Sequence, residues 1–235
     1  MILITRPKSE AEELQKQLEK KNIHCLIEPL THHKFIDRKI KFNEKNIYIC
    51  ASQRCVESLV RLKNNYNINL VVIGKKVEKL LRQNSFKNIL YVALDSKQLI
   101  KWMKKNNNYL SCYIYLSGNI INNEFINDLK KFQISYKRKI IYQTILKKSF
   151  HRNTIKNLKQ NKISSIVFFS KTSAYVFFKL LKKYKIFFVV KNLSFFVLSS
   201  RIAKVCKSHK IKHDVIKISP KPNQSSIISL ILDLK

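Results

Sequence analysis

The strongest constraint on the fold is a regular alternation between short apolar runs and segments with helical periodicity. The apolar runs predict strands at Ile2–Thr5, His24–Glu28, Ile47–Ala51, Leu70–Ile73, Ile89–Val92, Cys112–Leu116, Ser135–Tyr142, Ser165–Phe169, Ser194–Leu198 and Asp214–Ile218. The periodic segments predict helices at Ser9–Lys20, around Val56–Val60 and Val77–Leu81, and at Ser96–Lys105, Ile121–Lys131, Thr172–Lys183, Arg201–His209 and Gln224–Asp233. Strands that alternate with helices in this way are typical of βαβ units and parallel sheets. In the first helix, we expect Ser9 and Glu12 to form a capping box.

The same order of elements occurs twice along the chain. Residues 48–62 (YICASQRCVESLVRL) are echoed by residues 167–181 (VFFSKTSAYVFFKLL), each an apolar run, a hydroxyl-bearing turn and an amphipathic segment. Residues 71–92 parallel residues 196–218, and residues 2–30 parallel residues 113–142. A single doubly wound sheet is the alternative, but the repetition favours two similar α/β lobes. We expect them to be joined by two extended strands, at Pro29–Asp37 and Lys139–Leu146.

Several classes of protein are disfavoured by the sequence. No apolar run reaches the roughly 18 residues of a membrane-spanning helix, and the N-terminal run is too short for a signal peptide, so we expect a cytoplasmic protein. The five cysteines form no CxxC pair, which argues against disulfides or a zinc site. His32 and His33 are interpreted as surface residues rather than metal ligands. Dinucleotide, P-loop and GxSxG motifs are absent.

The net charge of +33 points at first sight to a nucleic-acid or other polyanionic partner. However, only eight of the 47 basic residues are arginine, and the lysines are spread along the whole chain. The chain is also rich in Asn, Ile, Phe and Tyr, which, like Lys, have A+T-rich codons. We therefore interpret much of the charge as genome composition rather than as a dedicated nucleic-acid site.

Hydroxyl side chains recur where predicted strands end and helices begin. They are Thr5, Ser52, Ser117, Ser170, Ser199 and Ser200. Ligands of open parallel sheets bind at the carboxyl ends of the strands, where helix N-termini attract anions. For each serine taken singly, a plain helix N-cap is the favoured interpretation. Together they predict a cleft between two lobes that suits a multiply charged anion.

These segments, taken in order, resemble the uroporphyrinogen-III synthase family. The resemblance runs from Ile2 to about Leu232 and rests on the order and spacing of several weak motifs. Those motifs are ILITRP…EAEELQKQLEKKNIHCLIEPL, YICASQRCVESL, VVIGKKVEKLL, YIYLSG, KRKIIYQT, IVFFSKTSAYVFF and ISPKPNQSSIISLI.

The resemblance implies a discontinuous lobe, residues 1–34 with 145–235, and a second lobe, residues 38–142. It also implies a cyclising hydro-lyase that needs no metal or organic cofactor. The sequence gives no grounds for an oligomer, so we expect a monomer, and we expect no nucleic-acid or membrane partner. Its small-molecule substrate is hydroxymethylbilane, a linear tetrapyrrole with eight carboxylates. The enzyme closes this chain to uroporphyrinogen III, with inversion of the last pyrrole ring and loss of water.

Carried over to this chain, the family tyrosine at the lobe exit corresponds to Tyr142, which is expected to donate a proton or hydrogen bond to the leaving hydroxyl. Packing at a strand end is the alternative role for this side chain. The residues expected to bind substrate are Thr5, Arg6, Ser52, Ser117, Gly118, Ser170, Lys171, Ser199 and Ser200. For Arg6, a contact with a substrate carboxylate and a bracing role in its turn are both open, with bracing favoured.

This chain departs from the family pattern at several hydroxyl and charged positions. The departures are Ala51, Val77, Ser117, Phe169, Lys171 and Ile202. They shift the expected binding role toward backbone amides and helix dipoles. Two other hypotheses stay open at this point, namely a basic nucleic-acid-associated α/β module and an inactive relative of the synthase.

Overall fold

The computed structural model describes residues 1–36, 40–62, 67–106, 112–121 and 123–233. Asp37, Arg38, Asn122 and the last two residues, which fall in predicted elements or lobes, lie outside the described residues. Contacts between Cα atoms divide the chain into two compact units. Unit 1 comprises Met1–His32 and Ile145–Lys235, and unit 2 comprises His33–Thr144.

Unit 1 is built on a five-stranded sheet in the order β11-β10-β9-β1-β2, with every pairing parallel. Its strands are β1 (Ile2–Ile4), β2 (Cys25–Ile27), β9 (Ser165–Phe168), β10 (Ser194–Val197) and β11 (Ile216–Ile218). Its helices are α1 (Lys8–Glu19), α6 (Arg152–Lys159), α7 (Lys171–Lys183), the 3₁₀ helix η1 (Phe187–Asn192), α8 (Ser200–Ser208) and α9 (Gln224–Leu232).

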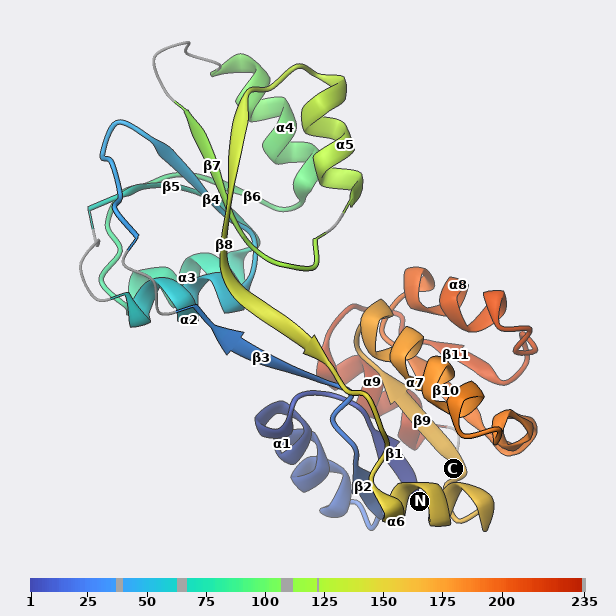
Figure 1. Cartoon of the computed structure of the whole chain (residues 1–235). Helices are drawn as coiled ribbons and strands as arrows, with labels where there is room; N and C mark the ends of the chain where they lie inside the picture. The colour runs from blue at the N-terminus through green and yellow to red at the C-terminus, as the bar shows by residue number, and fades with distance from the viewer. Residues whose placement is uncertain (37–39, 63–66, 107–111, 122, 234–235) are drawn as a thin grey trace. The chain divides into compact units, whose positions relative to one another are not determined.

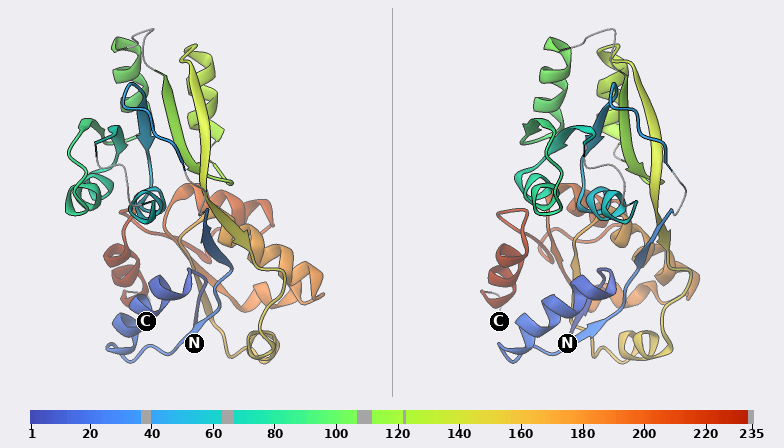
Figure 2. Two further views of the ribbon diagram at one scale, coloured as in Figure 1. Left: turned by 60° about the vertical axis from the view of Figure 1, so that its left-hand side comes forward. Right: turned by 90° about the vertical axis from the view of Figure 1, so that its left-hand side faces the viewer.

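Alternating side chains of the unit 1 strands supply two separate cores. Ile2 and Ile4 pack with α1 and α9 on one face, where the two helices lie side by side (Figures 1 and 2). Leu3 points to the other face and packs in the cluster formed with α6, α7 and α8. Because both faces are covered by helices, the central strands β1, β9 and β10 are apolar at nearly every position, as expected for a buried parallel sheet.

Unit 2 is built on a six-stranded sheet in the order β3-β8-β7-β4-β5-β6, in which β4 to β8 run parallel. Its strands are β3 (Thr31–Phe35), β4 (Ile47–Cys50), β5 (Asn69–Ile73), β6 (Ile89–Ala93), β7 (Tyr113–Gly118) and β8 (Tyr136–Leu146). Its helices are α2 (Gln53–Arg61), α3 (Lys75–Gln83), α4 (Ser96–Lys105) and α5 (Asn123–Lys131). The boundaries between the units fall inside β3 and β8, so these two strands join them.

The unit 2 sheet also has two cores on opposite faces. Tyr48 and Cys50 of β4 pack with α2 and α3, whereas Ile49 between them packs with α4 and α5 (Figure 1). Both units therefore have the same layered construction, with helices on either side of a mainly parallel sheet. The predicted fold class, two α/β lobes joined by two extended strands, is confirmed.

The capping box predicted at Ser9 and Glu12 is wrong. Helix α1 begins at Lys8 with Pro7 as its N-cap, and no side chain caps it. Proline presets φ near the helical value and lacks an N–H, so the helix begins directly after it and Ser9 lies inside the first turn.

Two helical elements were not predicted. Helix α6 was not predicted because only Thr154 and Leu158 are fully buried, so its sequence carries a weak apolar stripe. The 3₁₀ helix η1 was not predicted because its FFVVKN sequence is part of a longer apolar run. Among the described residues, no helix has the length and apolar character needed to cross a bilayer.

Candidate active site

Each sheet has one point where the direction of its winding reverses. In unit 1 the reversal lies between β1 and β9, and in unit 2 it lies between β4 and β7. Loops that leave the carboxyl ends of the two strands at such a point diverge and form a crevice, which is where open α/β sheets bind ligands. The predicted site residues Arg6 and Ser170 follow the first pair of strands, and Ser52 and Gly118 lie at the ends of the second pair.

In unit 2, Ser52 and Tyr142 come together at this reversal. Ser52 is the N-cap of α2, and its Oγ accepts a hydrogen bond from the Cys55 backbone N–H at 3.1 Å. The Tyr142 phenol oxygen lies 3.2 Å from the same Ser52 Oγ, and either oxygen can be the donor. A residue 90 positions away in sequence thus places its hydroxyl at the N-terminus of α2.

Gly118 is the residue against which the Tyr142 ring packs. A Cβ atom at position 118 would lie 2.5 Å from Tyr142 Cε2 and 2.9 Å from Cζ, which no ordinary contact permits. The parallel register shifts here, because Ser117 pairs with Ile140 but Gly118 pairs with Tyr142, leaving Ile141 as an extra residue in β8. Such a bulge re-aims the following side chain, and the absence of a side chain at Gly118 gives the phenol ring its place.

Burial raises the pKa of the Tyr142 phenol above its usual value of 10, with a smaller contribution in the same direction from the Cys55 thiol. Hydrogen bonds to Ser52 and to the Gly118 backbone act in the opposite direction without cancelling this shift. The phenol is therefore protonated at neutral pH. It is able to donate a proton or hydrogen bond to a group that gains negative charge.

His33 lies beside Tyr142 and was not predicted as part of the site. Its ring meets the Tyr142 ring edge to face at a centroid distance of 6.2 Å, and its Nδ1 is 3.2 Å from Thr144 Oγ1. The interpretation of both histidines as surface residues is wrong for His33, which is half-buried, although His32 is exposed. Nothing in the sequence signals this contact, because it depends on how β3 lies against β8.

Ser117, predicted to bind substrate, turns its hydroxyl into the protein. The residue is only 3% exposed, and its Oγ accepts a hydrogen bond from Arg138 Nε at 2.8 Å. The Arg138 guanidinium also donates to the carbonyl oxygens of Gly118 and Asn119, at 2.5 and 3.0 Å. Arg138 of β8 thus places a positive charge beside the end of β7, and the sequence did not point to this residue.

Thr5 in unit 1, also predicted to bind substrate, is turned inward as well. Its side chain is fully buried, and its hydroxyl donates to the Val167 carbonyl at 2.8 Å. The hydroxyl therefore links β1 to β9 across the reversal point rather than facing solvent.

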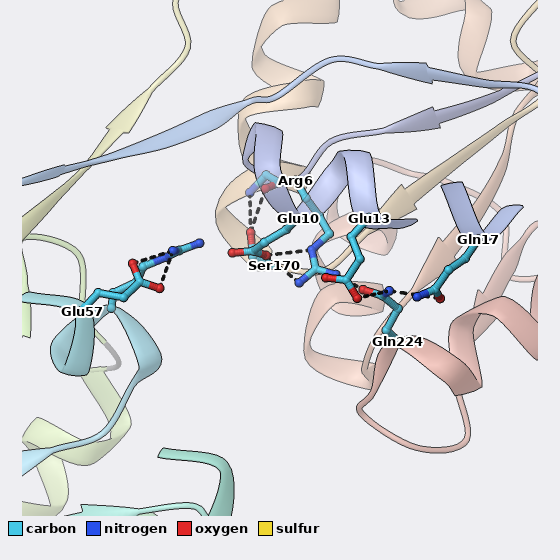
Figure 3. A network of polar contacts seen from close by, with 9 residues as sticks. Arg6, Glu10, Glu13, Gln17, Glu57, Ser170 and Gln224 are labelled. Carbon is cyan, nitrogen blue, oxygen red and sulfur yellow. Dashed lines mark hydrogen bonds and ion pairs between the residues drawn. The ribbon is translucent and has the colours of Figure 1, made fainter. Parts of the chain in front are cut away.

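Arg6 braces the turn after β1, the role that the sequence favoured. Its Nε and Nη2 donate to Glu10 Oε2 at 2.9 and 2.5 Å, and its Nη1 donates to Gln224 Oε1 at 2.6 Å (Figure 3). Its guanidinium lies over the Phe169 ring at 4.1 Å. Gln224 in turn donates to Glu13 and Gln17, so one arginine ties the starts of α1 and α9 and the end of β9 together (Figure 3).

The remaining predicted residues lie at two other helix starts of unit 1. Ser170 is the N-cap of α7, and its Oγ accepts from the Ser173 N–H at 3.0 Å. Lys171 is the exposed first residue of that helix. Ser199 is the N-cap of α8 but makes no capping hydrogen bond through its side chain, and Ser200 is exposed at the first position of the helix. Among the described residues, no group of three His, Cys, Asp or Glu side chains is placed to hold a metal ion.

The fold and these residues define a class of two-unit parallel α/β proteins with polar helix starts at the reversal point of each sheet. The model of the family described as uroporphyrinogen-III synthase HemD matches residues 12–229. The chain belongs to the uroporphyrinogen-III synthase family, whose members are cyclising hydro-lyases of tetrapyrrole biosynthesis.

Solved structures of this family share the fold. The uroporphyrinogen-III synthetase of Helicobacter pylori matches with a TM-score of 0.66 at 20% identity, over 90% of this chain and 92% of that one. A mutant uroporphyrinogen III synthase of the extremely thermophilic bacterium Thermus thermophilus matches with a TM-score of 0.60 at 10% identity, over 100% and 97% of the two chains. A comparison with curated protein sequences found no match.

Proposed function

We propose that this chain converts hydroxymethylbilane to uroporphyrinogen III, and that Tyr142 takes part in the loss of the hydroxyl group. The observation that carries the proposal is the protonated Tyr142 phenol, 3.2 Å from the Ser52 hydroxyl at the N-terminus of α2. This placement is at the carboxyl edge of a parallel sheet, where ligands of such folds bind. Membership of the family supports the same reaction.

The first step breaks the bond between the hydroxymethyl carbon and its oxygen. Hydroxide is a poor leaving group, so a proton transferred from the Tyr142 phenol lets the oxygen depart as water and leaves a phenolate on Tyr142. The Ser52 hydroxyl and the positive end of the α2 dipole then stabilise the negative charge on the Tyr142 phenolate oxygen. What remains on the substrate is a cationic azafulvene.

The second step sets the product isomer. The last pyrrole attacks through its substituted carbon to form a spiro intermediate, which rearranges and loses a proton to give the inverted ring. Without the enzyme the linear chain closes without inversion, so the protein must stabilise the folded conformation of the chain in this transition state.

We propose that the carboxylates of the substrate are held by helix starts and backbone amides. In unit 1 the candidates are Ser170, Lys171, Ser199 and Ser200, and in unit 2 they are Ser52 and the backbone of Gly118. Ser199 supports this role because its hydroxyl does not cap its own helix. Arg6 contributes by holding the turn after β1, since its donors are used by Glu10 and Gln224.

The chain is proposed to act as a cytoplasmic monomer composed of the two lobes, residues 1–34 with 145–235 and residues 38–142. Its five cysteines are free, and Cys50, Cys55 and Cys206 are buried, which suits a reducing compartment. Sedimentation of the purified protein tests the monomer, and a dimer at micromolar concentration would contradict it.

The product isomer tests the proposed function directly. Freshly prepared hydroxymethylbilane is supplied to the purified protein, and we expect isomer III to replace the isomer I that forms spontaneously. The product is separated and quantified by chromatography after oxidation to the porphyrin. Isomer I alone, with folded protein present, would show that the chain is an inactive relative.

Replacement of Tyr142 by Phe tests the role of the phenol. We expect turnover to fall about a hundredfold because a general acid is lost, while the free energy of unfolding falls by only about 1 kcal/mol. Tyr113→Phe is the matched control, since this buried tyrosine of the neighbouring strand β7 donates to the Asn106 carbonyl at 3.1 Å, away from Ser52. Equal turnover in both variants and in the wild type would remove Tyr142 from the mechanism.

A further inference from the structure

We propose that Asn119 and Arg138 are positioning residues that hold the bulged part of β8 and thereby place the Tyr142 phenol. The proposal rests on the function proposed above, and it assigns a role to two side chains that neither the sequence motifs nor the family match singled out. They attach β8 to the end of β7 on opposite sides of Ile141, the extra residue of the bulge.

The ordinary ladder between the two strands ends at the position of Tyr142. Strand β7 ends at Gly118, whereas β8 continues to Leu146, so Thr144 has no strand residue of β7 opposite it. Parallel strands are held by backbone hydrogen bonds, and a bulge interrupts them. Without further contacts, Tyr142 would lie at the loosest point of this strand pair.

Asn119 supplies the missing attachment after the bulge. Its Oδ1 accepts a hydrogen bond from the Thr144 N–H at 2.7 Å, and its Nδ2 donates to the Thr144 carbonyl at 3.2 Å. A side-chain amide carries one acceptor and two donors, so here it pairs with Thr144 as a further backbone unit of β7 would. The amide thus continues the ladder for one residue past the end of the strand.

Arg138 supplies the attachment before the bulge. Its guanidinium donates to Ser117 Oγ and to the carbonyl oxygens of Gly118 and Asn119, so one side chain contacts three successive residues. The rigid, planar donor set of arginine suits such a multiple contact, and a lysine ammonium cannot reproduce it. Gly118, on which the Tyr142 ring packs, is therefore held from one side by Arg138 and followed on the other by the Asn119 amide.

Replacement of Asn119 by Ala removes the attachment to Thr144. We expect kcat to fall roughly tenfold to a hundredfold, because a small displacement of a catalytic group has effects of this size, with KM changed less than about twofold. Asn69→Ala is the matched control, since Asn69 Nδ2 also donates to a backbone carbonyl of unit 2, that of Glu44 at 2.6 Å, away from Tyr142. The control is expected to keep wild-type kcat.

A measurement on Tyr142 itself separates positioning from general destabilisation. In protein labelled at the tyrosine ring carbon that bears the hydroxyl, the Tyr142 signal is assigned by its loss in Tyr142→Phe and followed as pH rises. Burial raises the pKa of this phenol above 10 in the wild type. In Asn119→Ala we expect the pKa to move back toward 10 as the ring becomes more exposed, with no such change in Asn69→Ala.

Arg138 is tested with two substitutions that separate its shape from its charge. Arg138→Lys keeps the charge but not the three contacts, and we expect it to lose as much kcat as Arg138→Ala. Wild-type kcat and wild-type Tyr142 titration in Arg138→Lys would overturn the positioning role of Arg138.

The outcomes distinguish the positioning proposal from the proposed function. If the wild type makes isomer III and Asn119→Ala has both wild-type kcat and wild-type Tyr142 titration, the positioning proposal is wrong and the function stands. If the wild type makes only isomer I, the proposed function is wrong. The titration of Tyr142 in Asn119→Ala and in Asn69→Ala then still decides whether Asn119 positions the phenol.

Discussion

At the scale of single residues, the direction of a hydroxyl matters more than its place in a motif. Thr5 and Ser117 both lie at strand ends, yet their side chains are buried and hydrogen-bonded to a neighbouring strand. Ser52 and Ser170 occupy the N-cap positions of α2 and α7, where their hydroxyls accept hydrogen bonds from backbone N–H groups of the first turn. A hydroxyl at the end of a strand therefore bonds to the neighbouring strand, whereas a hydroxyl at the following helix N-cap lies at the edge of the sheet where ligands bind.

Tyr115 gives a prediction about pH at this scale. Burial, as the largest cause, raises the pKa of its phenol to about 12, and nearby Tyr142 adds to the shift. Because the folded state holds this proton more tightly than the unfolded state, stability is fully present below pH 10 and declines as pH rises through 12.

The expected loss from this group across that window is about 2 to 3 kcal/mol. Urea denaturation at pH 9 and at pH 11.5 measures it, with the wild type compared with Tyr115→Phe. The wild type should lose more stability than the variant between the two pH values. An identical loss in the two proteins would show that Tyr115 does not cause the decline.

At the scale of elements, a buried carboxylate organises the start of α6 in unit 1. Glu28 follows β2 and is fully buried, which the sequence did not predict. Its Oε2 accepts from the backbone N–H of His151, the N-cap of α6, at 3.0 Å, and its Oε1 forms an ion pair with Lys147. Glu28 therefore fixes both the beginning of α6 and the chain segment that leads into it.

Replacement of Glu28 by Gln is expected to lower the free energy of unfolding by about 2 kcal/mol at neutral pH. The loss arises because Lys147 keeps its charge but loses its partner. Such a loss is large for a fully buried pair, and it is reduced here because solvent reaches part of the Lys147 side chain. Thermal or urea denaturation measures it. Glu78→Gln is the control, because its ion pair with Arg82 is partly exposed on α3, and its loss should not exceed about 0.5 kcal/mol. Equal losses in the two variants would contradict the role of Glu28.

At the scale of the whole molecule, the high net positive charge does not by itself indicate what the protein acts on. The net charge of +33 comes mostly from lysine, and the chain belongs to a family that acts on a small molecule. A strongly basic protein still attracts any polyanion at low ionic strength. The hypothesis of a nucleic-acid-associated module therefore predicts a different salt dependence from that of a basic synthase.

We expect the protein to retard random-sequence DNA in gels at about 50 mM salt and to lose this binding by about 200 mM, since counterion release makes such contacts steeply salt-dependent. The measurement is a titration of DNA with protein at several salt concentrations. Tight binding that persists at the higher salt would favour the nucleic-acid module. The product-isomer assay on the same preparation then shows whether both properties belong to one protein.

The layered α/β construction can be read from local patterns in the sequence. Runs such as residues 71–73 and 166–168 are apolar along their length because both faces of each sheet are covered, and that pattern is local and readable. The doubled order of elements and the serines that begin α2 and α7 were readable for the same reason, since strand, turn and helix follow one another directly. Helix α6, with few buried positions, was not.

Which of these residues come into contact depends on how distant parts of the chain pack together. The contacts of Tyr142 with Ser52, Gly118 and His33 join β8 to α2, β7 and β3, and the contact with Ser52 alone spans 90 positions of sequence. They depend on strand order and on one extra residue in β8, and neither leaves a periodic signal in the sequence. Hydrophobic patterning records whether a side chain is buried, whereas the partner of a polar group is set by the register of strands that the chain brings together from a distance.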